Sequence, residues 1–202
     1  MRYLPIELDI RGRDALVIGT GPAVNSKIDR LLAAGATVTV IAEGPLDAEL
    51  ARKDREGALT VQHRAFEERD LEGKVIVFLA PSQTPEEEAL AKKLHQIALR
   101  EGRLLCAIDR PEASTFVNAA VVRATNLTMT VSTDGRSPGA ARRIREDLSV
   151  LFSDPRWERY VAALGSMREK LPKGERAAKM AEAVRGFAVE ARLRFPDWFE
   201  NG

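Results

Sequence analysis

The sequence predicts an α/β protein with a parallel sheet domain, a small β segment after it and a helical C-terminal region. Short apolar and β-branched runs alternate with helical patterns over roughly the first 110 residues, which is typical of parallel strands joined by right-handed crossovers. Two neighbouring strand patterns follow without a helix between them. The remainder of the chain, from about residue 137, carries only helical patterns.

The parallel domain is expected to hold five strands with helices between them. The apolar runs predict strands over residues 15–18, 37–42, 59–63, 75–80 and 104–108. Helical spacing predicts helices over residues 27–34, 46–55 and 84–100. The third helix has the best start signals, because Pro85 fits its first turn and Glu86, Glu87 and Glu88 lie near the positive end of its dipole.

The second half of the chain predicts a β pair and then helices. Residues 116–123 and 127–133 read as strands joined by a short turn, which favours antiparallel pairing. Helices are expected over residues 140–152, after Asp154, and over residues 175–193. We therefore expect a dinucleotide-binding domain over residues 1–112, a dimerisation segment over 113–146 and a helical region over 147–202.

Composition excludes several classes of protein. The chain of 202 residues has 31 Lys and Arg against 30 Asp and Glu, a net charge of +1, which argues against a bulk polyanion binder. No basic stretch is interleaved with aromatic residues, so nucleic acid is not an expected partner. The longest apolar runs are far shorter than the roughly 20 residues of a membrane span, and no membrane is expected. The two histidines and one cysteine show no paired spacing, and no metal site is expected.

The single cysteine, Cys106, excludes an internal disulfide and favours a reducing compartment. The first residues contain no apolar signal region. The expected location is the cytoplasm.

A glycine loop lies between the first predicted strand and the first helix. Its residues are Gly19, Thr20, Gly21, Pro22 and Ala23. Gly19 permits a tight turn, and Gly21 allows the backbone to approach a pyrophosphate attracted by the helix N-terminus. Pro22 removes one amide donor. The loop predicts dinucleotide binding, although a plain strand-to-helix turn is the alternative.

Two further positions bear on the prediction that this loop binds a dinucleotide. Val24 occupies the third glycine position, where its side chain would loosen close packing of the helix on the strand. Glu43, at the end of the second predicted strand, is placed to accept hydrogen bonds from the adenosine ribose. Because a carboxylate there would repel a 2′-phosphate, NAD is favoured over NADP.

Several segments together resemble a known family. The motifs are Tyr3-Leu4-Pro5-Ile6, the glycine loop, residues 27–36, Ala107-Ile108-Asp109-Arg110-Pro111 with Phe116, and residues 131–138 with 141–145. Together they resemble the N-terminal module of siroheme synthase, which also occurs alone as precorrin-2 dehydrogenase, with or without sirohydrochlorin ferrochelatase activity. The resemblance covers about residues 1–150, in order and without large gaps.

The resemblance implies a Rossmann-like, NAD-dependent homodimer that oxidises precorrin-2, an anionic tetrapyrrole, to sirohydrochlorin in siroheme or cobalamin synthesis. Some members then insert a metal. The family's catalytic aspartate falls on Asp109, its cofactor loop on residues 19–23, and further cofactor contacts near Glu43 and Gly44. Three positions depart from the family pattern: Pro81-Ser82-Gln83, Cys106 and Asp134. Val24, Pro22 and Pro81-Ser82-Gln83 motivate one alternative, a tetrapyrrole-binding protein or chelatase without dehydrogenase activity. A further alternative is an NAD-responsive regulatory module without tetrapyrrole chemistry.

The residues themselves suggest how such chemistry would work. Asp109 follows the fifth predicted strand, at the carboxyl edge where open α/β sheets bind ligands. A carboxylate there can take the proton released in a dehydrogenation or a metal insertion; the alternative is that it only shapes a turn.

A basic stretch over residues 123–145 holds five arginines and one acid, +5 − 1 = +4. Arginine suits a substrate with many carboxylates, so Arg142 is a candidate substrate ligand, with an exposed basic helix face as the alternative. Ser132, Thr133 and Ser137 are candidate hydroxyl donors, with turn capping as the alternative. His63, His95 and Cys106 read as structural residues. The face with Trp157, Tyr160 and Leu164 reads as core or dimer contact rather than as a porphyrin platform.

Overall fold

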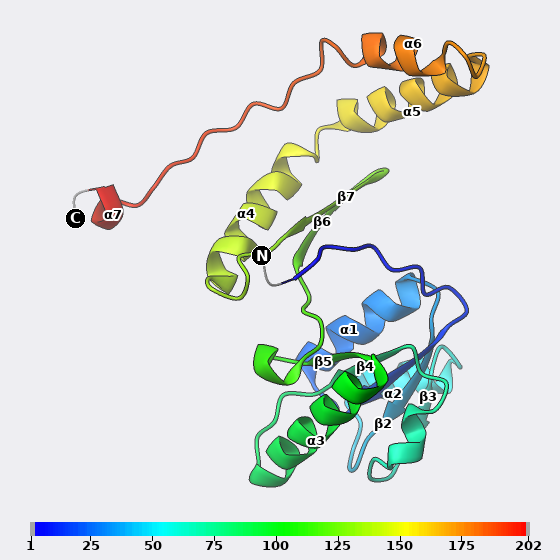
Figure 1. The fold of residues 1–202 in the computed structure, drawn as a ribbon, viewed down its shortest axis with the longest axis vertical. Coiled ribbons are helices and arrows are strands. Elements are labelled where there is room, and N and C mark those ends of the chain that lie inside the picture. The colour runs from blue at the N-terminus through cyan, green and yellow to red at the C-terminus, as the bar shows by residue number, and fades with distance from the viewer. Residues whose placement is uncertain (1–2, 201–202) are drawn as a thin grey trace. The chain divides into compact units, whose positions relative to one another are not determined.

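A computed structural model describes residues 3–200 of the chain. Its centre is an all-parallel five-stranded sheet with the strand order β3-β2-β1-β4-β5 (Figure 1). The strands are β1 (Asp14–Ile18), β2 (Thr37–Ile41), β3 (Thr60–Gln62), β4 (Ile76–Leu79) and β5 (Leu104–Ala107). The order reverses between β1 and β4. A crevice at the carboxyl ends of the strands is expected at such a reversal.

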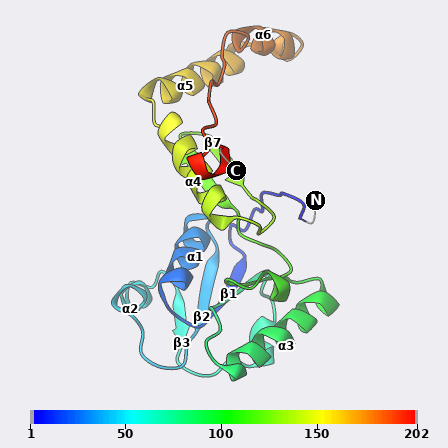
Figure 2. The same cartoon turned by 90° about the vertical axis from the view of Figure 1, so that its left-hand side faces the viewer.

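Helices cover both faces of this sheet (Figure 2). They are α1 (Pro22–Ala33) and α2 (Ala48–Arg55) on one face, and α3 (Pro85–Glu101) on the other, with the 3₁₀ turns η1 (Glu68–Leu71) and η2 (Pro111–Ala113) in the connections. Two buried clusters follow from this arrangement. Ala15 and Val17 of β1 pack under α1, while Leu16 and Ile18 of the same strand pack under α3.

The central strands are apolar because both of their faces are covered. All four residues of β4 are buried, as are the last four of β1. Strands of this kind read as continuous Val, Ile and Leu runs rather than as alternating patterns. The expected α/β fold class, with its parallel sheet, β pair and helical end, is confirmed.

The outer side of β5 is closed by the segment after η2. The Thr115 hydroxyl accepts from the amide of Leu105 at 2.8 Å and donates to the carbonyl of Arg103 at 2.8 Å. The Ser114 hydroxyl accepts from the amide of Ala107 at 2.9 Å, and the Thr115 amide donates to the Leu105 carbonyl at 2.8 Å. Side-chain hydroxyls therefore replace much of the ladder that a sixth strand would supply.

The chain forms two compact units. Unit 1 comprises residues 1–119 and 132–139, and unit 2 comprises residues 120–131 and 140–202. Unit 2 contains an antiparallel pair, β6 (Ala120–Ala124) and β7 (Leu127–Val131), which turns at Asn126 with φ 57°. Helix α4 (Pro138–Leu151) begins in unit 1 and continues in unit 2, which also holds α5 (Pro155–Lys170) and α6 (Arg176–Ala183). The domain boundaries expected at residues 112 and 146 stay a prediction.

The expected final helix over residues 175–193 is wrong in its length. Helix α6 ends at Ala183, and only a short helix, α7 (Asp197–Glu200), follows. The chain turns at residues 184–186, and the Phe187 ring stacks on Tyr160 with centroids 5.1 Å apart. Gly186, a residue of low helix propensity, lies in this turn, so the sequence itself disfavours the continuation of the helix before Phe187 packs on α5. Within residues 3–200, none of the helices has the length and apolar character to cross a membrane.

Candidate active site

A cleft of about 400 Å³ opens at the carboxyl ends of β1, β2 and β4. It lies in unit 1, at the reversal of the strand order. Its walls come from the end of β1 with the glycine loop, the end of β2, the segment after β3, and the end of β4 with the start of α3. The lining residues are Ile18, Gly19, Thr20, Gly21, Pro22, Ala23, Ile41, Ala42, Glu43, Arg64, Phe66, Leu79, Ala80, Pro81, Gln83, Glu87 and Leu90.

Gly19 is required by the close approach of the strand next to it. Its amide donates to the carbonyl of Ile41 at 2.8 Å, which carries the ladder between β1 and β2 one residue further. Its φ is 93°, and a Cβ at this position would lie 2.5 Å from Cβ of Ala80, just after β4. The tight turn expected at Gly19 therefore has two causes, an unusual backbone angle and a lack of space.

The glycine loop and α1 form a cradle for an anion. Gly21 is the N-cap residue of α1, with φ 120° and no side-chain cap. Among the described residues, the amides of Thr20, Gly21 and Ala23 have no hydrogen-bond acceptor, and Pro22 has no amide hydrogen. Free amides at a helix N-terminus attract a phosphate group. The loop fits a pyrophosphate with three donors, one fewer than it would have without Pro22.

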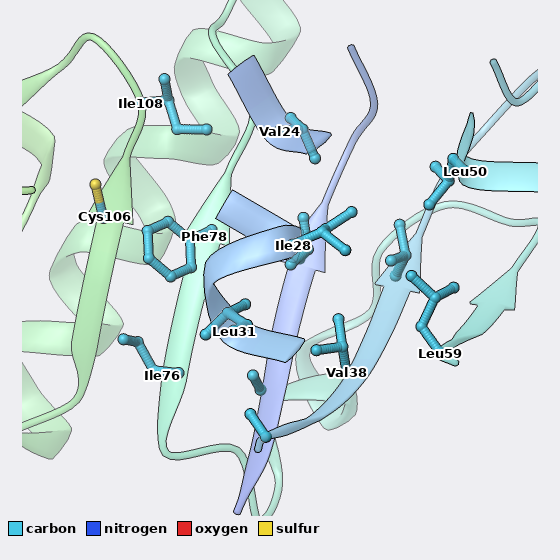
Figure 3. Packing of buried hydrophobic residues seen from close by; sticks show 14 of the residues in the cluster. Val24, Ile28, Leu31, Val38, Leu50, Leu59, Ile76, Phe78, Cys106 and Ile108 are labelled. Atoms are coloured by element: carbon cyan, nitrogen blue, oxygen red, sulfur yellow. The ribbon is translucent and has the colours of Figure 1, made fainter. Parts of the chain in front are cut away.

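Val24 does not loosen the packing of α1, contrary to expectation. Its side chain is fully buried in the cluster that joins α1 to the sheet, near Ile28 of the same helix (Figure 3). Val17 of β1 belongs to the same cluster. The branched side chain occupies the space between α1 and the sheet. A glycine, which the usual pattern has at this position, would let the strand approach the helix more closely. The helix N-terminus is still open to a ligand because Val24 lies below the loop, in the core.

The loop that carries Glu43 and Gly44 is fastened to α1. Glu43 follows β2 by two residues, is exposed and lines the cleft, whereas Gly44 is not among the lining residues. A few residues on, Asp47 caps α2 by accepting from the Leu50 amide at 2.9 Å, and it also accepts from Asn25 of α1 at 2.9 Å. These bonds hold the pKa of Asp47 below its ordinary value. The carboxylate of Glu43 is thus placed beside the cradle, as the sequence predicts.

Sequence reasoning missed four other residues that line the cleft. Arg64 and Phe66 come from the segment after β3, and Glu87 and Leu90 from α3. Phe66 and Leu90 also pack against the α3-side core, so this end of the cleft combines apolar surface with charged groups. The position of Arg64, two residues after a parallel strand, is the signal that could have identified it.

Asp109 lies in a strained turn just beyond β5. Its φ is 64°, its side chain is exposed, and it is not among the residues that line the cleft. Aspartate tolerates this left-handed conformation better than most residues. Strain of this kind occurs at functional sites, but the turn is also an ordinary connection to η2, so both interpretations from the sequence stay open.

Two ionisable groups lie within electrostatic range of Asp109. Lys27 of α1 is partly buried, and burial, together with Arg30, lowers its pKa despite the opposing charges of Cys106 and Asp109. Burial raises the pKa of the Cys106 thiol. Cys106 also accepts from Asn118 at 3.6 Å and lies in the core beside Phe78. It therefore has the environment of a core residue.

The four expected substrate ligands lie close together in the sequence, within residues 132–142. Ser132, Thr133 and Ser137 belong to unit 1, whereas Arg142 belongs to unit 2. The Ser132 hydroxyl accepts from the Asp134 amide at 3.2 Å, and Thr133 accepts from the Ser137 amide at 3.0 Å. Turn capping is therefore observed for the first two, and an exposed hydroxyl can add a ligand bond to it.

The basic stretch is partly neutralised by acids that follow it. Arg142 pairs with Glu146 at 3.0 Å, and Arg143 pairs with Asp147 at 2.8 Å. Both arginine side chains are largely exposed, at 76% and 73%, so these pairs are weak and can exchange for a carboxylate ligand. In α5, the ring of Trp157 packs on Phe152 and Phe187, and its indole N–H donates to the Thr125 carbonyl at 3.0 Å. This face is a local core of unit 2.

The fold and the cleft define a class: a dinucleotide-binding α/β protein with its site at the β1–β4 reversal. Residues 6–120 match a protein-family model described as "Putative NAD(P)-binding". The match spans more than half of the chain, and the chain belongs to this family of NAD(P)-binding domains. The cofactor expected from the sequence, NAD, agrees with it.

Sequence comparison with known proteins shows which NAD(P)-binding proteins this chain is similar to. The chain is 32% identical over 152 residues to a siroheme synthase of Nitrosococcus oceani, covering 75% of this chain and 31% of that protein. It is 33% identical over 186 residues to siroheme synthase 3 of Aeromonas hydrophila, covering 92% and 38%. It spans about a third of the length of these curated relatives.

A solved structure named "SirC, precorrin-2 dehydrogenase" has the same fold. It superposes with a TM-score of 0.76 and covers 91% of this chain and 90% of that one, at 23% identity. The family resemblance expected from the sequence is thus confirmed.

Proposed function

We propose that this chain is an NAD-dependent dehydrogenase that oxidises precorrin-2 to sirohydrochlorin. The observation that supports it most is the cleft at the strand reversal, which combines the open α1 N-terminus with the exposed carboxylate of Glu43. The likeness to siroheme synthases supplies the substrate class. NAD bound in this cleft would accept a hydride from the tetrapyrrole.

Different residues of the cleft would bind different parts of the cofactor. The amides of Thr20, Gly21 and Ala23 would bind the pyrophosphate, since they lack other acceptors among the described residues. Glu43 would accept hydrogen bonds from the adenosine ribose and would repel a 2′-phosphate there. Phe66 and Leu90 offer apolar surface to the adenine.

Asp109 would take the proton that leaves the substrate with the hydride. Its exposed carboxylate is available to a ligand, and its turn is held by η2, where the Ser114 hydroxyl donates to the Arg110 carbonyl at 2.8 Å. Arg110 is itself paired with Glu88 of α3 at 2.6 Å. A base fixed in this way can act on a bound substrate without a change in its loop.

Substrate carboxylates would be met by Ser132, Thr133, Ser137 and Arg142. The arginine fork matches a carboxylate in two hydrogen bonds. A homodimer, as the family implies, and a cytoplasmic location complete the proposal.

The test is the reaction itself. Purified protein is incubated with precorrin-2 and NAD, and NADH and sirohydrochlorin are followed by absorbance. We expect both products in equal amounts. Substrate and NAD that bind without turnover would instead identify a tetrapyrrole-binding protein. NAD binding without any binding of tetrapyrrole would identify a regulatory module. Ferrous iron or cobalt added afterwards tests for chelation.

The role of Asp109 is tested by Asp109→Asn, which removes the charge but tolerates the positive φ. We expect turnover to fall by about 100-fold, the usual contribution of a general base, with NAD affinity unchanged. Glu112→Gln, a change to an exposed acid of η2, is the matched control. Full turnover by Asp109→Asn would remove this residue from the mechanism.

A further inference from the structure

Arg64 lies beside Glu43 at the edge of the cleft. Strands β2 and β3 pair in parallel with Ile41 opposite Gln62. Glu43 and Arg64 each follow these partners by two residues, and both line the cleft. An arginine next to a ribose-binding carboxylate is a candidate ligand for a 2′-phosphate, which would favour NADP.

The hydrogen bonds of Arg64 are already used within the protein. Nη1 donates to Oδ2 of Asp70 at 2.8 Å and to the Ala65 carbonyl at 2.9 Å. Nη2 donates to Oδ1 of Asp70 and to Oε1 of Gln62, both at 2.5 Å. A guanidinium has five N–H groups, so only the one on Nε lacks a partner in the described part of the chain.

Asp70 is well fixed as the counter-charge. Its side chain is only 9% exposed, against 32% for Arg64, and it also accepts from the Glu67 amide at 2.9 Å. The hydrogen bonds from Arg64 hold the pKa of Asp70 below its ordinary value, and the same pair raises the pKa of Arg64. The pair therefore stays charged, and is neutral as a unit, at every pH at which the protein would be assayed.

We propose that Asp70 determines the preference of the cleft for NAD over NADP by keeping Arg64 away from the 2′ position of the ribose. The inference rests on the proposed dinucleotide site. With Arg64 neutralised, the carboxylate of Glu43, which lines the cleft and has no ion pair in the described part of the chain, opposes a 2′-phosphate. Without Asp70, the guanidinium would regain free donors and a net positive charge next to the same ribose.

The experiment measures dissociation constants for NAD and for NADP by calorimetry. Asp70→Asn places an amide NH₂ group against the guanidinium, which releases Arg64 while keeping the shape of the side chain. We expect the affinity for NADP to rise about tenfold relative to NAD, the effect of one charge-assisted hydrogen bond. In the double variant Asp70→Asn with Arg64→Gln, this gain should disappear.

A second variant tests the same idea in the opposite direction. Arg64→Gln alone leaves the charge of Asp70 uncompensated, so the affinity for NADP relative to NAD should fall below that of the wild type. Glu101→Gln is the control, because it removes a carboxylate paired with Arg103 at 2.7 Å at the amino edge of the sheet. Its NADP-to-NAD ratio should equal that of the wild type.

The outcomes separate this inference from the proposed function. A wild-type protein that binds NAD while both Asp70→Asn and Arg64→Gln keep the wild-type ratio would overturn the role of Asp70 alone. The role of Asp70 would also be overturned if the rise in NADP affinity relative to NAD persists in the double variant Asp70→Asn with Arg64→Gln. A wild-type protein that binds neither dinucleotide would overturn the proposed function, and the inference with it. If Asp70→Asn fails to fold, Arg64→Gln decides.

Discussion

Both the sequence pattern and the packing in the structure require a glycine at position 19. The glycine pattern predicts a turn there, and the structure adds the approach of Ala80, which no pattern within the loop can reveal. Gly21 differs, because a Cβ at that position would meet nothing within 4 Å although its φ is 120°. The two glycines therefore separate the effect of space from the effect of backbone angle.

Gly19→Ala should lower the free energy of unfolding by about 3 kcal/mol, since it combines backbone strain with overpacking. Gly21→Ala, the matched control, carries strain alone and should cost about 1–2 kcal/mol. Urea unfolding followed by circular dichroism measures both. Equal losses in the two variants would show that the contact with Ala80 has no energetic weight.

The titration of the Cys106 thiol should make the free energy of unfolding depend on pH. Burial raises its pKa above the ordinary value of 9.0. The folded protein then keeps the thiol proton at pH values where the unfolded chain has lost it. Its contribution to stability is therefore complete below pH 9.0 and decreases as the pH rises towards the higher folded value.

Comparison with Cys106→Ala isolates this contribution. The difference in unfolding free energy between wild type and variant should decrease as the pH rises above 9.0, by up to about 1.4 kcal/mol per pH unit, until the folded thiol also titrates. Urea titrations across this range measure it. A difference that does not change with pH would show that the thiol titrates normally in the folded protein.

At the scale of elements, α1 shows how a departure from a motif is accommodated. A valine at the third glycine position suggested loose packing from the sequence. The structure instead places Val24 in the main core, fully buried. The pattern describes the average member of a class, whereas the space between this helix and its strand depends on the side chains of both.

Val24→Gly, which restores the usual pattern, should therefore destabilise the protein. It removes a buried side chain and adds a helical glycine, for a total of about 2–4 kcal/mol. Ala23→Gly is the matched control and should cost about 1 kcal/mol, for helix propensity alone. Thermal unfolding compares the two. A Val24→Gly protein as stable as wild type would mean that the helix settles closer to the sheet.

Most helices and strands could be predicted from the sequence. The features that could not be predicted depend on contacts between separate segments of the chain. The central strands β1 and β4 have strong apolar runs because they are buried on both faces. The sequence predicts a longer α6 because helical spacing alone takes no account of Gly186 as a helix end, and because the contact of Phe187 with Tyr160 joins residues 27 positions apart, which local spacing does not reveal. The Arg64–Asp70 pair was missed for a related reason, since its place beside Glu43 depends on the register of two strands.

At the scale of the whole molecule, the cleft depends on one part of the chain. Every residue that lines it lies between Ile18 and Leu90, within unit 1. Deletion of residues 172–202 should therefore leave the affinity for NAD within about twofold of wild type, because none of these residues is among those that line the cleft. Calorimetric titration of the shortened protein measures this. A tenfold loss would show that the C-terminal residues take part in cofactor binding.

The closed side of β5 has a consequence for how the molecule behaves in a crowded solution. An open sheet normally offers its outermost strands as templates on which a strand of another molecule can assemble. Here the hydroxyls of Ser114 and Thr115 already occupy the donors and acceptors of Leu105 and Ala107, and the opposite edge is the three-residue β3. The sheet is thus protected at both ends against growth into a fibril, and replacing the two hydroxyls with alanine would remove that protection along β5.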